Sequence, residues 1–446
     1  MKKILLLIFS LSGAFAAEQK PNVIFILADD LGFGDIACYG CPDARTPNID
    51  KLAEQGAKYT NFYANGTECT PTRTSIMTGR YPQFAGGMEC AIGTGNVGRY
   101  DDAIRLAAKS QLGLPVNQTV IPGVFIKAGY RTGIFGKWHL GYEPHFNPTK
   151  YGWDEFFGCL GGNVDYFTHR ELSPLPALFR NDKPVTREGY MTHLILDEAL
   201  EFISKNKKSP FFCYVPFTTP HFPFQAPSDK EKQFNKENWT EGSRGSYVAM
   251  LEDLDLAVGK ILQRLKSLKL EKNTLVIFAS DHGAMKPGSN LPWSGYKGSL
   301  FEGGIRAPLI ARWPGKIRPG TICSQVGATF DLTTSFARIT RTQVKDRNLD
   351  GIDIIAYAEK NLDPTPRDLY WRAKRGDRTW WAVLEHDGKQ TRKYLRRKEG
   401  KQTEEWFFNL ENDPGENKNL FALPDNYGHK LKGKLANWEK SMKSLR

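Results

Sequence analysis

Two apolar runs, far apart along the chain, each end in side chains that can bind a metal ion. Residues 23–28 are followed by the pair Asp29-Asp30, and residues 275–280 are followed by Asp281-His282. A short, continuous apolar run predicts a strand that is buried on both faces. Ligands collect at the carboxyl ends of strands in a largely parallel sheet, so a functional site is expected where these two strands end.

Helical periodicity fills much of the chain between the two predicted strands. Apolar residues recur at a spacing of three and four positions in residues 48–55, 121–128, 190–203 and 247–268. This spacing is typical of amphipathic helices. Because strands alternate with helices, the sequence predicts an α/β domain with a large, mostly parallel or mixed central sheet flanked by helices.

The pattern changes near residue 331. Shorter strand-like pieces at 380–385 and 406–410 alternate with turn signals at 387–388 and 413–415. An amphipathic pattern at 430–443 follows. We therefore expect a catalytic domain at 18–330 and a smaller subdomain at 331–446, made of an antiparallel sheet and a terminal helix.

The first residues have the form of a bacterial signal peptide. Lys2 and Lys3 precede an apolar run at 4–9, and small residues at 14–16 form a cleavage site. We expect residues 1–17 to direct export to the periplasm or the medium. This run is too short to span a bilayer, and no later run reaches about 18 apolar residues, so no membrane span is expected.

The chain of 446 residues carries a net charge of +12, and much of the excess lies in its last quarter. Such a field attracts polyanions. An exported protein without a nucleic-acid-binding motif fits sulfated polysaccharide better than nucleic acid. A solvated basic face without a specific partner is an equal alternative for the C-terminal charges.

Seven cysteines allow up to three disulfides and one cysteine with a separate role, which would be Cys69. Cys38 and Cys41 are close enough in sequence for a small loop bridge. Buried free cysteines are an equally good explanation, and the pairing cannot be read from the sequence.

A short motif gives the strongest chemical signal. Cys69, Pro71 and Arg73 follow the pattern C-x-P-x-R, and T-G-R follows at 78–80. Six further blocks accompany it, at 22–30, 46–50, 136–141, 220–221, 280–283 and 297–306. In content and in order these blocks resemble those of the type I formylglycine-dependent sulfatases, which have an alkaline-phosphatase-like fold.

The resemblance implies that Cys69 is the nucleophile in a modified form. A formylglycine-generating maturation enzyme would oxidise its side chain to the aldehyde formylglycine, whose hydrate attacks sulfur. Arg73 would support this nucleophile, since its five donors suit a hydroxyl-bearing or anionic partner. A helix that begins behind Cys69 would favour negative charge there through its N-terminal dipole.

The same resemblance implies a metal site made of Asp29, Asp30, residue 69, Asp281 and His282. Three carboxylates favour a hard cation, so Ca²⁺ is expected first and Mg²⁺ next. His282 stands where many members carry asparagine. Because a histidine nitrogen also suits zinc or manganese, this set of ligands selects Ca²⁺ less strongly than a set of oxygen ligands would.

Four further residues complete the implied machinery. Lys137 and His139 lie on one side of an extended segment, as a sulfate clamp and as the base that regenerates the aldehyde. His221 and Lys297 would stabilise the sulfate and protonate the leaving oxygen, and either of them could be the acid.

Sugar-binding candidates flank these blocks: Trp138, Asn163, Asp165, His169 and Trp293. For each aromatic residue, packing in the core is at least as good an explanation.

The sequence therefore predicts hydrolysis of sulfate esters, with sulfated carbohydrate as the preferred substrate class. One alternative is a phosphonate or phosphate ester hydrolase of the same superfamily. Another is a noncatalytic protein that binds sulfated glycans on this fold. A cysteine-dependent phosphatase is excluded, because Ser75 stands where that chemistry needs an arginine.

Overall fold

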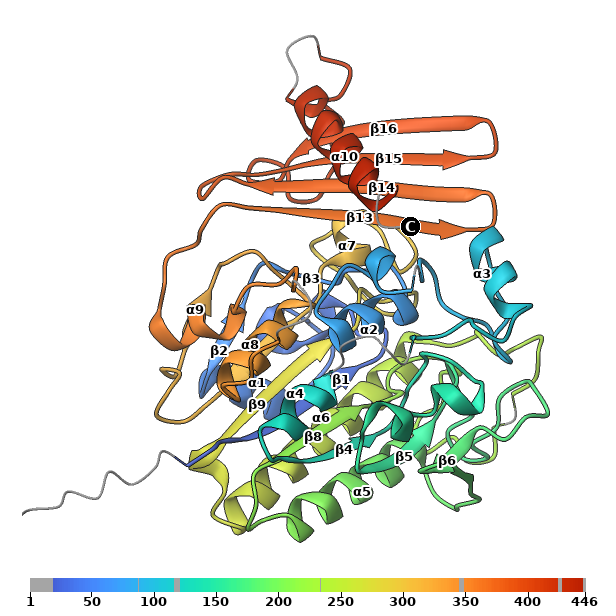
Figure 1. Ribbon diagram of the computed structural model, residues 1–446, viewed down its shortest axis with the longest axis vertical. Coiled ribbons are helices and arrows are strands. Elements are labelled where there is room, and N and C mark those ends of the chain that lie inside the picture. Colours follow the sequence, from blue (N-terminus) through green and yellow to red (C-terminus); the bar gives the residue numbers. More distant parts are fainter. Residues whose placement is uncertain are drawn as a thin grey trace, which may run out of the picture.

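The structure is a computed structural model that describes residues 19–86, 88–115, 121–232, 234–344, 349–423 and 427–443. The predicted signal peptide, residues 1–17, lies outside the described residues. Figure 1 shows a large α/β part and, above it, a smaller part made of four strands and a helix.

A ten-stranded sheet forms the centre of the larger part, in the order β11-β2-β10-β9-β1-β8-β4-β5-β6-β7. Its strands are β1 (Asn22–Ala28), β2 (Ala57–Tyr59), β4 (Arg131–Phe135), β5 (Glu155–Cys159), β6 (Leu178–Arg180), β7 (Lys183–Pro184), β8 (Phe211–Pro216), β9 (Thr274–Ser280), β10 (Leu309–Arg312) and β11 (Thr321–Cys323). β1 pairs in parallel with β8 and β9, whereas β10 runs antiparallel to β9. The predicted mixed, mostly parallel sheet is confirmed.

Helices cover both faces of this sheet. They include α1 (Pro47–Glu54), α2 (Cys69–Thr78), α4 (Ile121–Lys127), α5 (Met191–Lys205), α6 (Arg244–Ser267), α8 (Asp331–Ile339) and α9 (Ile354–Lys360). Alternate residues of β1 point to opposite faces, so Phe25 packs with α2, α4, α8 and α9, while Ile24 packs with α1, α5 and α6. The four predicted helices are confirmed, with ends within three residues of the prediction.

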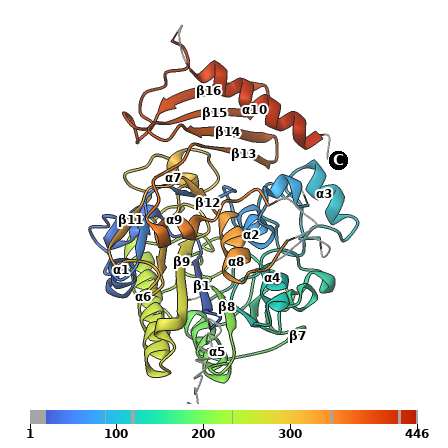
Figure 2. The same cartoon turned by 60° about the vertical axis from the view of Figure 1, so that its left-hand side comes forward.

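The smaller part is the predicted antiparallel sheet with its terminal helix. β13 (Arg367–Arg375), β14 (Arg378–His386), β15 (Thr391–Glu399) and β16 (Gln402–Asn409) pair in sequence order, and α10 (Gly428–Lys443) follows. Val383 and Tyr394 on one face pack against Leu431 and Leu435 of α10. Figure 2 shows this helix on the outer face of the sheet.

The inner face of the small sheet packs on the larger part. Trp371 is buried against Tyr63, and its indole Nε1 donates a hydrogen bond to a backbone carbonyl 2.7 Å away. A buried ion-pair cluster crosses the same contact: Lys393 Nζ lies 2.9 Å from a carboxylate oxygen of both Glu302 and Glu416. The two parts therefore share apolar and charged contacts.

The small sheet begins at β13, whereas α8 and α9 pack on the central sheet with β1 and α4. The predicted domain boundary between residues 330 and 331 stays a prediction.

The cysteines do not form the disulfide framework that their number allowed. All seven lie within the described residues, and all are free. Cys159 and Cys213 are buried core residues of central strands, where the thiol packs as a small apolar group. Cys41 Sγ instead lies 3.2 Å from Asp43 Oδ1, so the bridge that was considered between Cys38 and Cys41 is wrong.

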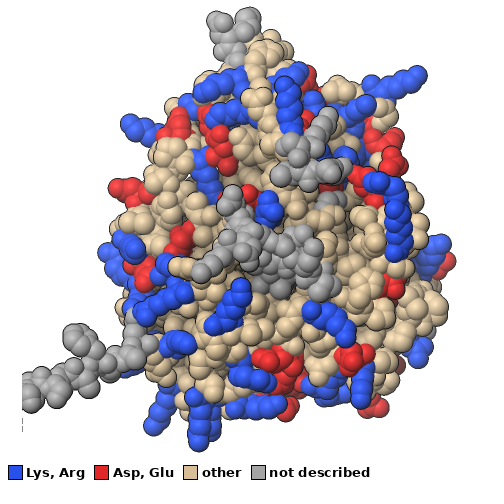
Figure 3. Space-filling view, in the orientation of Figure 1, with Lys and Arg blue, Asp and Glu red and all other residues tan. Residues whose placement is uncertain are grey.

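Lysines and arginines are spread over the face in Figure 3, with acidic residues between them. Within the described ranges, no helix has both the length and the apolar character that a membrane crossing needs.

Candidate active site

The site begins at the N-terminus of α2. Cys69 is the first residue of this helix and is only 1% exposed. The preceding loop passes so close that a Cβ on Gly66 would lie 2.6 Å from the ring of Pro71. The local sequence therefore places the Cys69 side chain at the positive end of the helix dipole.

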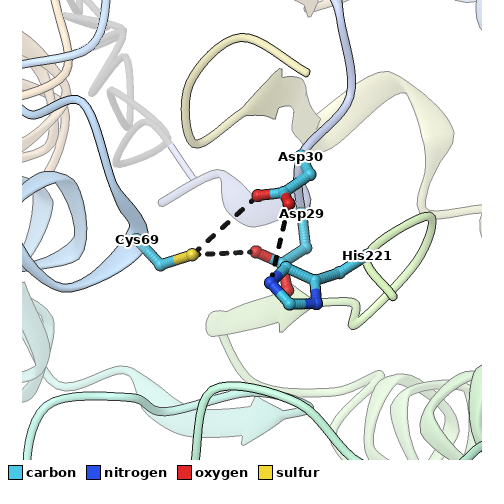
Figure 4. Close-up of side chains that lie close together, drawn as sticks. All are labelled: Asp29, Asp30, Cys69 and His221. Atoms are coloured by element: carbon cyan, nitrogen blue, oxygen red, sulfur yellow. Dashed lines mark hydrogen bonds and ion pairs between the residues drawn. The ribbon is translucent and has the colours of Figure 1, made fainter. Parts of the chain in front are cut away.

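Three carboxylates meet this side chain because β1 and β9 are neighbours in the sheet. Asp29 and Asp30 follow β1, and Asp281 follows β9. Cys69 Sγ lies 3.5 Å from Asp29 Oδ1 and 4.0 Å from Asp30 Oδ1. The Asp30 backbone N–H donates to Asp281 Oδ1 at 3.1 Å, which ties the two strand ends together. Figure 4 shows Cys69 directed at the two aspartates, with His221 beside them.

Three buried cations balance these carboxylates. The Arg73 guanidinium lies 3.3 Å from Asp29 and 3.4 Å from Asp281. Lys137 Nζ lies 2.6 Å from Asp29 Oδ2 and 3.2 Å from Cys69 Sγ. Lys297, the third cation, contacts the remaining aspartate, Asp30.

Lys297 Nζ donates to both oxygens of Asp30, at 2.8 and 2.9 Å, and lies 3.6 Å from Cys69 Sγ. Burial by itself would lower the pKa of Lys297, but the adjacent Asp30 raises it above the ordinary value, so the ammonium stays charged. Burial raises the pKa of the Cys69 thiol far above its usual range, in spite of Lys137 and Lys297. Unmodified Cys69 is therefore a protonated thiol and a weak nucleophile.

The donor set fits a divalent cation. Ligand atoms of Asp29, Asp30, Cys69 and His221 lie within 4.8 Å of one another, and so do those of Cys69, Asp281 and His282. These oxygen-rich groups suit a hard cation.

His282 adds a second sign of a cation site. Its Nδ1 is 2.9 Å from the carbonyl oxygen of Gly283, which can only accept, so Nδ1 carries the proton of the neutral ring. The Nε2 lone pair then faces carboxylate oxygens of Asp30 at 3.5 Å and Asp281 at 3.6 Å. A cation between these three acceptors would satisfy all of them.

His139 is held as a neutral base. Its backbone has a φ of 57°, and its Nε2 donates to the carbonyl oxygen of Ile92 at 2.8 Å. Nδ1 is buried and has no hydrogen-bond partner among the described residues. Burial, reinforced by Lys137, holds the pKa of His139 well below its ordinary value. The ring thus offers an unprotonated nitrogen in the site.

His221 has the opposite tautomer. Its Nδ1 lies 2.7 Å from the carbonyl oxygen of Phe222, so its Nε2 presents a lone pair to Lys297 Nζ at 3.2 Å. The Tyr166 hydroxyl lies 3.0 Å from the His221 carbonyl oxygen and supports this loop. Burial and Lys297 lower the pKa of His221. The lysine is therefore the donor of this pair.

A pocket of about 340 Å³ opens beside Cys69. Of the residues predicted from the sequence it is lined by Cys69, His139, Asn163, His221 and Lys297. Sequence reasoning missed several polar lining residues: Glu68, Thr94, Arg99, Tyr142, Thr240, Arg375 and Arg378.

Four of the five predicted sugar-binding residues are placed elsewhere, since they are absent from the pocket lining that the described residues form. Trp138 is 1% exposed and donates from Nε1 to the carbonyl oxygen of Phe146 at 2.8 Å. It lies between two site residues on an extended segment, so alternation turns it into the core. This alternation of side chains can be read from the sequence.

The other three have local structural contacts. Asp165 accepts hydrogen bonds from two backbone N–H groups of its own turn, and His169 Nε2 lies 2.9 Å from a backbone carbonyl oxygen. Trp293 packs under the guanidinium of Arg306, 3.9 Å from the ring centre. Core packing, the alternative considered for the aromatic residues, describes Trp138, whereas Trp293 is half-buried and lines a separate pocket.

The large mixed sheet between two layers of helices is the fold of the alkaline-phosphatase superfamily, which includes the sulfatases. The sequence model of the family described as Sulfatase matches residues 21–342, and the chain belongs to that family. It is thus a sulfatase, an enzyme that hydrolyses sulfate esters.

Several characterised proteins are similar to this chain. N-acetylgalactosamine-6-sulfatase of Rattus norvegicus is 35% identical over 79% of this chain and 69% of its own length. Arylsulfatase A of Homo sapiens is 32% identical over 78% of this chain and 69% of its own length.

Solved structures of other proteins are also similar to this chain. Ps i-CgsB in complex with k-i-k-neocarrahexaose has a TM-score of 0.79 at 30% identity, covering 94% of this chain and 93% of that one. The phosphonate monoester hydrolase of Agrobacterium radiobacter, at 19% identity and a TM-score of 0.65 over 95% of each chain, shares the fold.

Proposed function

We propose that this sulfatase removes sulfate from a carbohydrate, using formylglycine made from Cys69 and a bound divalent cation, Ca²⁺ first. One observation carries the proposal: Cys69 Sγ lies 3.2 Å from Lys137 Nζ, 3.4 Å from His282 Nε2 and 3.5 Å from Asp29 Oδ1. The sulfur stands where the oxygen of the modified residue would lie, between the cation ligands and the lysines.

In this proposal, formylglycine supplies a hydroxyl nucleophile, and the cation polarises the sulfate. Asp29, Asp30, Asp281 and His282 hold the cation. Mg²⁺ or another divalent ion would use the same residues. Arg73 fixes the orientation of the two carboxylates that it contacts.

Lys137 and Lys297 flank Cys69 and bind sulfate oxygens as charge develops on them. His139 accepts a proton at Nδ1, the nitrogen that the fold leaves free. The hydrogen bonds favour Lys297 as the acid for the leaving oxygen, because its ammonium donates to the Nε2 lone pair of His221 and therefore carries the proton of this pair.

A carbohydrate substrate is supported by the size and polarity of the pocket, which suit a single sugar unit. The rat relative is named for sulfated N-acetylgalactosamine, and the solved relative Ps i-CgsB holds a neocarrahexaose. We further propose export to the periplasm or the medium and a formylglycine-generating maturation enzyme as a partner.

Two measurements test this proposal together. Sulfate release is assayed on a panel of defined sulfated mono- and oligosaccharides with Ca²⁺ present, and the tryptic peptide that contains residue 69 is analysed by mass spectrometry. We expect turnover of at least one sugar sulfate and an aldehyde at residue 69, with no turnover by Cys69→Ala. Active enzyme with an unmodified cysteine would contradict the nucleophile, and activity on aryl sulfates alone would contradict the substrate class.

A further inference from the structure

We propose that Arg378, at the tip of the β13–β14 hairpin, and Arg99, whose backbone this tip contacts, form a second anion subsite in the active-site pocket. This subsite would hold another anionic group of the same substrate while the sulfate to be cleaved lies at Cys69. The proposal rests on the proposed function and specifies its substrate class as a sugar with at least two anionic groups.

The hairpin brings the small sheet to the pocket. β13 ends at Arg375 and β14 begins at Arg378, and both arginines line the pocket with Cys69 and Lys297. Gly376, in the two-residue turn, has a φ of 60° and donates its N–H to the carbonyl oxygen of Arg99 at 2.6 Å. Figure 1 shows this tip above the segment that leads into α3 (Asp101–Ala107). Arg99 is therefore a third arginine at the same wall of the pocket.

One of the three arginines anchors the hairpin. Arg375 Nη1 lies 2.9 Å from Glu68 Oε1, and the other oxygen of this buried carboxylate accepts the backbone N–H of Ala91 at 2.8 Å. Glu68 directly precedes Cys69. Its charge is therefore matched by Arg375, and the pair positions the hairpin tip beside the nucleophile.

The other two arginines differ from the catalytic cations in their charge balance. Lys137, Lys297 and Arg73 each have an aspartate partner. By contrast, Arg99 and Arg378 line the pocket and make no ion pair with any residue that the structure describes. The surplus positive charge of the pocket therefore lies on its wall, next to the site of cleavage.

The guanidinium groups of Arg99 and Arg378 determine which ligand this wall of the pocket can bind. A guanidinium group presents a planar fork of donors that fits the oxygens of a sulfate or a carboxylate. A neutral sugar ring would leave both positive charges without a partner. We therefore infer a substrate whose sugar carries a second sulfate, or whose neighbouring unit is a uronic acid.

The test compares one sugar in three forms. The best monosulfated sugar of the panel is assayed beside the same sugar with a second sulfate and beside its disaccharide with a uronic acid. We expect wild-type kcat/KM to be highest on one of the two dianionic forms, which also identifies the group that the subsite binds. Higher salt should reduce this preference, since screening weakens the charge attraction.

Arg99→Gln and Arg378→Gln should each lower kcat/KM on the preferred dianionic form by about tenfold, as expected for the loss of one charge-assisted hydrogen bond. Both should lower kcat/KM on the monosulfated sugar much less than on the dianionic form. Arg318→Gln is the matched control, because Arg318 is exposed on the loop between β10 and β11 and is not part of the described pocket lining.

Equal losses on all three forms, or a wild type without any preference, would overturn the subsite while the proposed function stands. Calorimetry with the Cys69→Ser variant measures binding of the same three sugars without turnover. Equal affinities for the mono- and dianionic forms in that experiment would overturn the subsite whether or not the wild type hydrolyses them.

Discussion

Glu171 should make the stability of this protein depend on pH, and replacing it with glutamine should remove that dependence. Its carboxyl is 9% exposed, and one oxygen accepts from the Tyr142 hydroxyl at 3.5 Å. The other oxygen has no partner among the described residues. Burial raises the pKa of Glu171 from 4.5 to about 7.

The sign follows from the order in which the two states lose their proton. The unfolded chain releases it near pH 4.5, whereas the folded protein keeps it until about pH 7. Between these values the folded state binds more protons, so the free energy of unfolding falls as pH rises. The pKa difference of about 2.5 corresponds to about 3.5 kcal/mol, at about 1.4 kcal/mol for each pH unit.

We expect Glu171→Gln to match the wild type near pH 4.5 and to exceed its free energy of unfolding by about 3.5 kcal/mol above pH 7. Urea unfolding followed by tryptophan fluorescence across this range measures the difference. Glu188→Gln, at an exposed carboxyl, is the control and should follow the wild type throughout. Parallel curves for Glu171→Gln and the wild type would refute the reasoning.

Three further predictions concern charged groups. Lys393→Met should lower the free energy of unfolding by about 3–5 kcal/mol, because it leaves Glu416 buried without a cation and Glu302 with Arg306 alone. A loss below about 1 kcal/mol in urea unfolding would contradict this. Ca²⁺ should raise the melting temperature of the wild type but not of Asp281→Ala, and equal shifts would exclude Asp281 as a ligand. Lys297→Ala should slow hydrolysis of a sugar sulfate far more than that of an activated aryl sulfate, and equal losses would argue against its role as the acid.

The centre of the fold follows from the hydrophobic pattern of the sequence. The runs that became β1 and β9 are apolar and each followed by acidic residues, so local periodicity was enough to place Asp29 and Asp281 at the ends of strands. The structure adds that these two strands are neighbours. The helices that pack on this sheet have the same strong signal. The local hydrophobic pattern predicts these strands and helices because each of them buries a regular face of its own.

The residues that were missed depend on packing between distant segments. Arg375 contacts Glu68 across 307 positions, and a sequence without homologues does not show such a contact. The number of cysteines left disulfides and buried free thiols equally open, and Cys159 and Cys213 are free because they lie on core strands. Trp138 could have been excluded, since its two neighbours already face the site.

The contact between Arg375 and Glu68 joins two segments that are synthesised at different times. The hairpin that forms one wall of the pocket is translated 307 residues after the segment that it covers. At about 5–20 residues per second, this interval lasts about 15–60 seconds. During that time the growing chain lacks the hairpin, which lines the pocket beside Cys69. The Cys69 thiol is 1% exposed only in the complete, folded protein. The late position of the small sheet in the chain thus leaves a period in which the proposed maturation enzyme would meet the thiol before the pocket is complete.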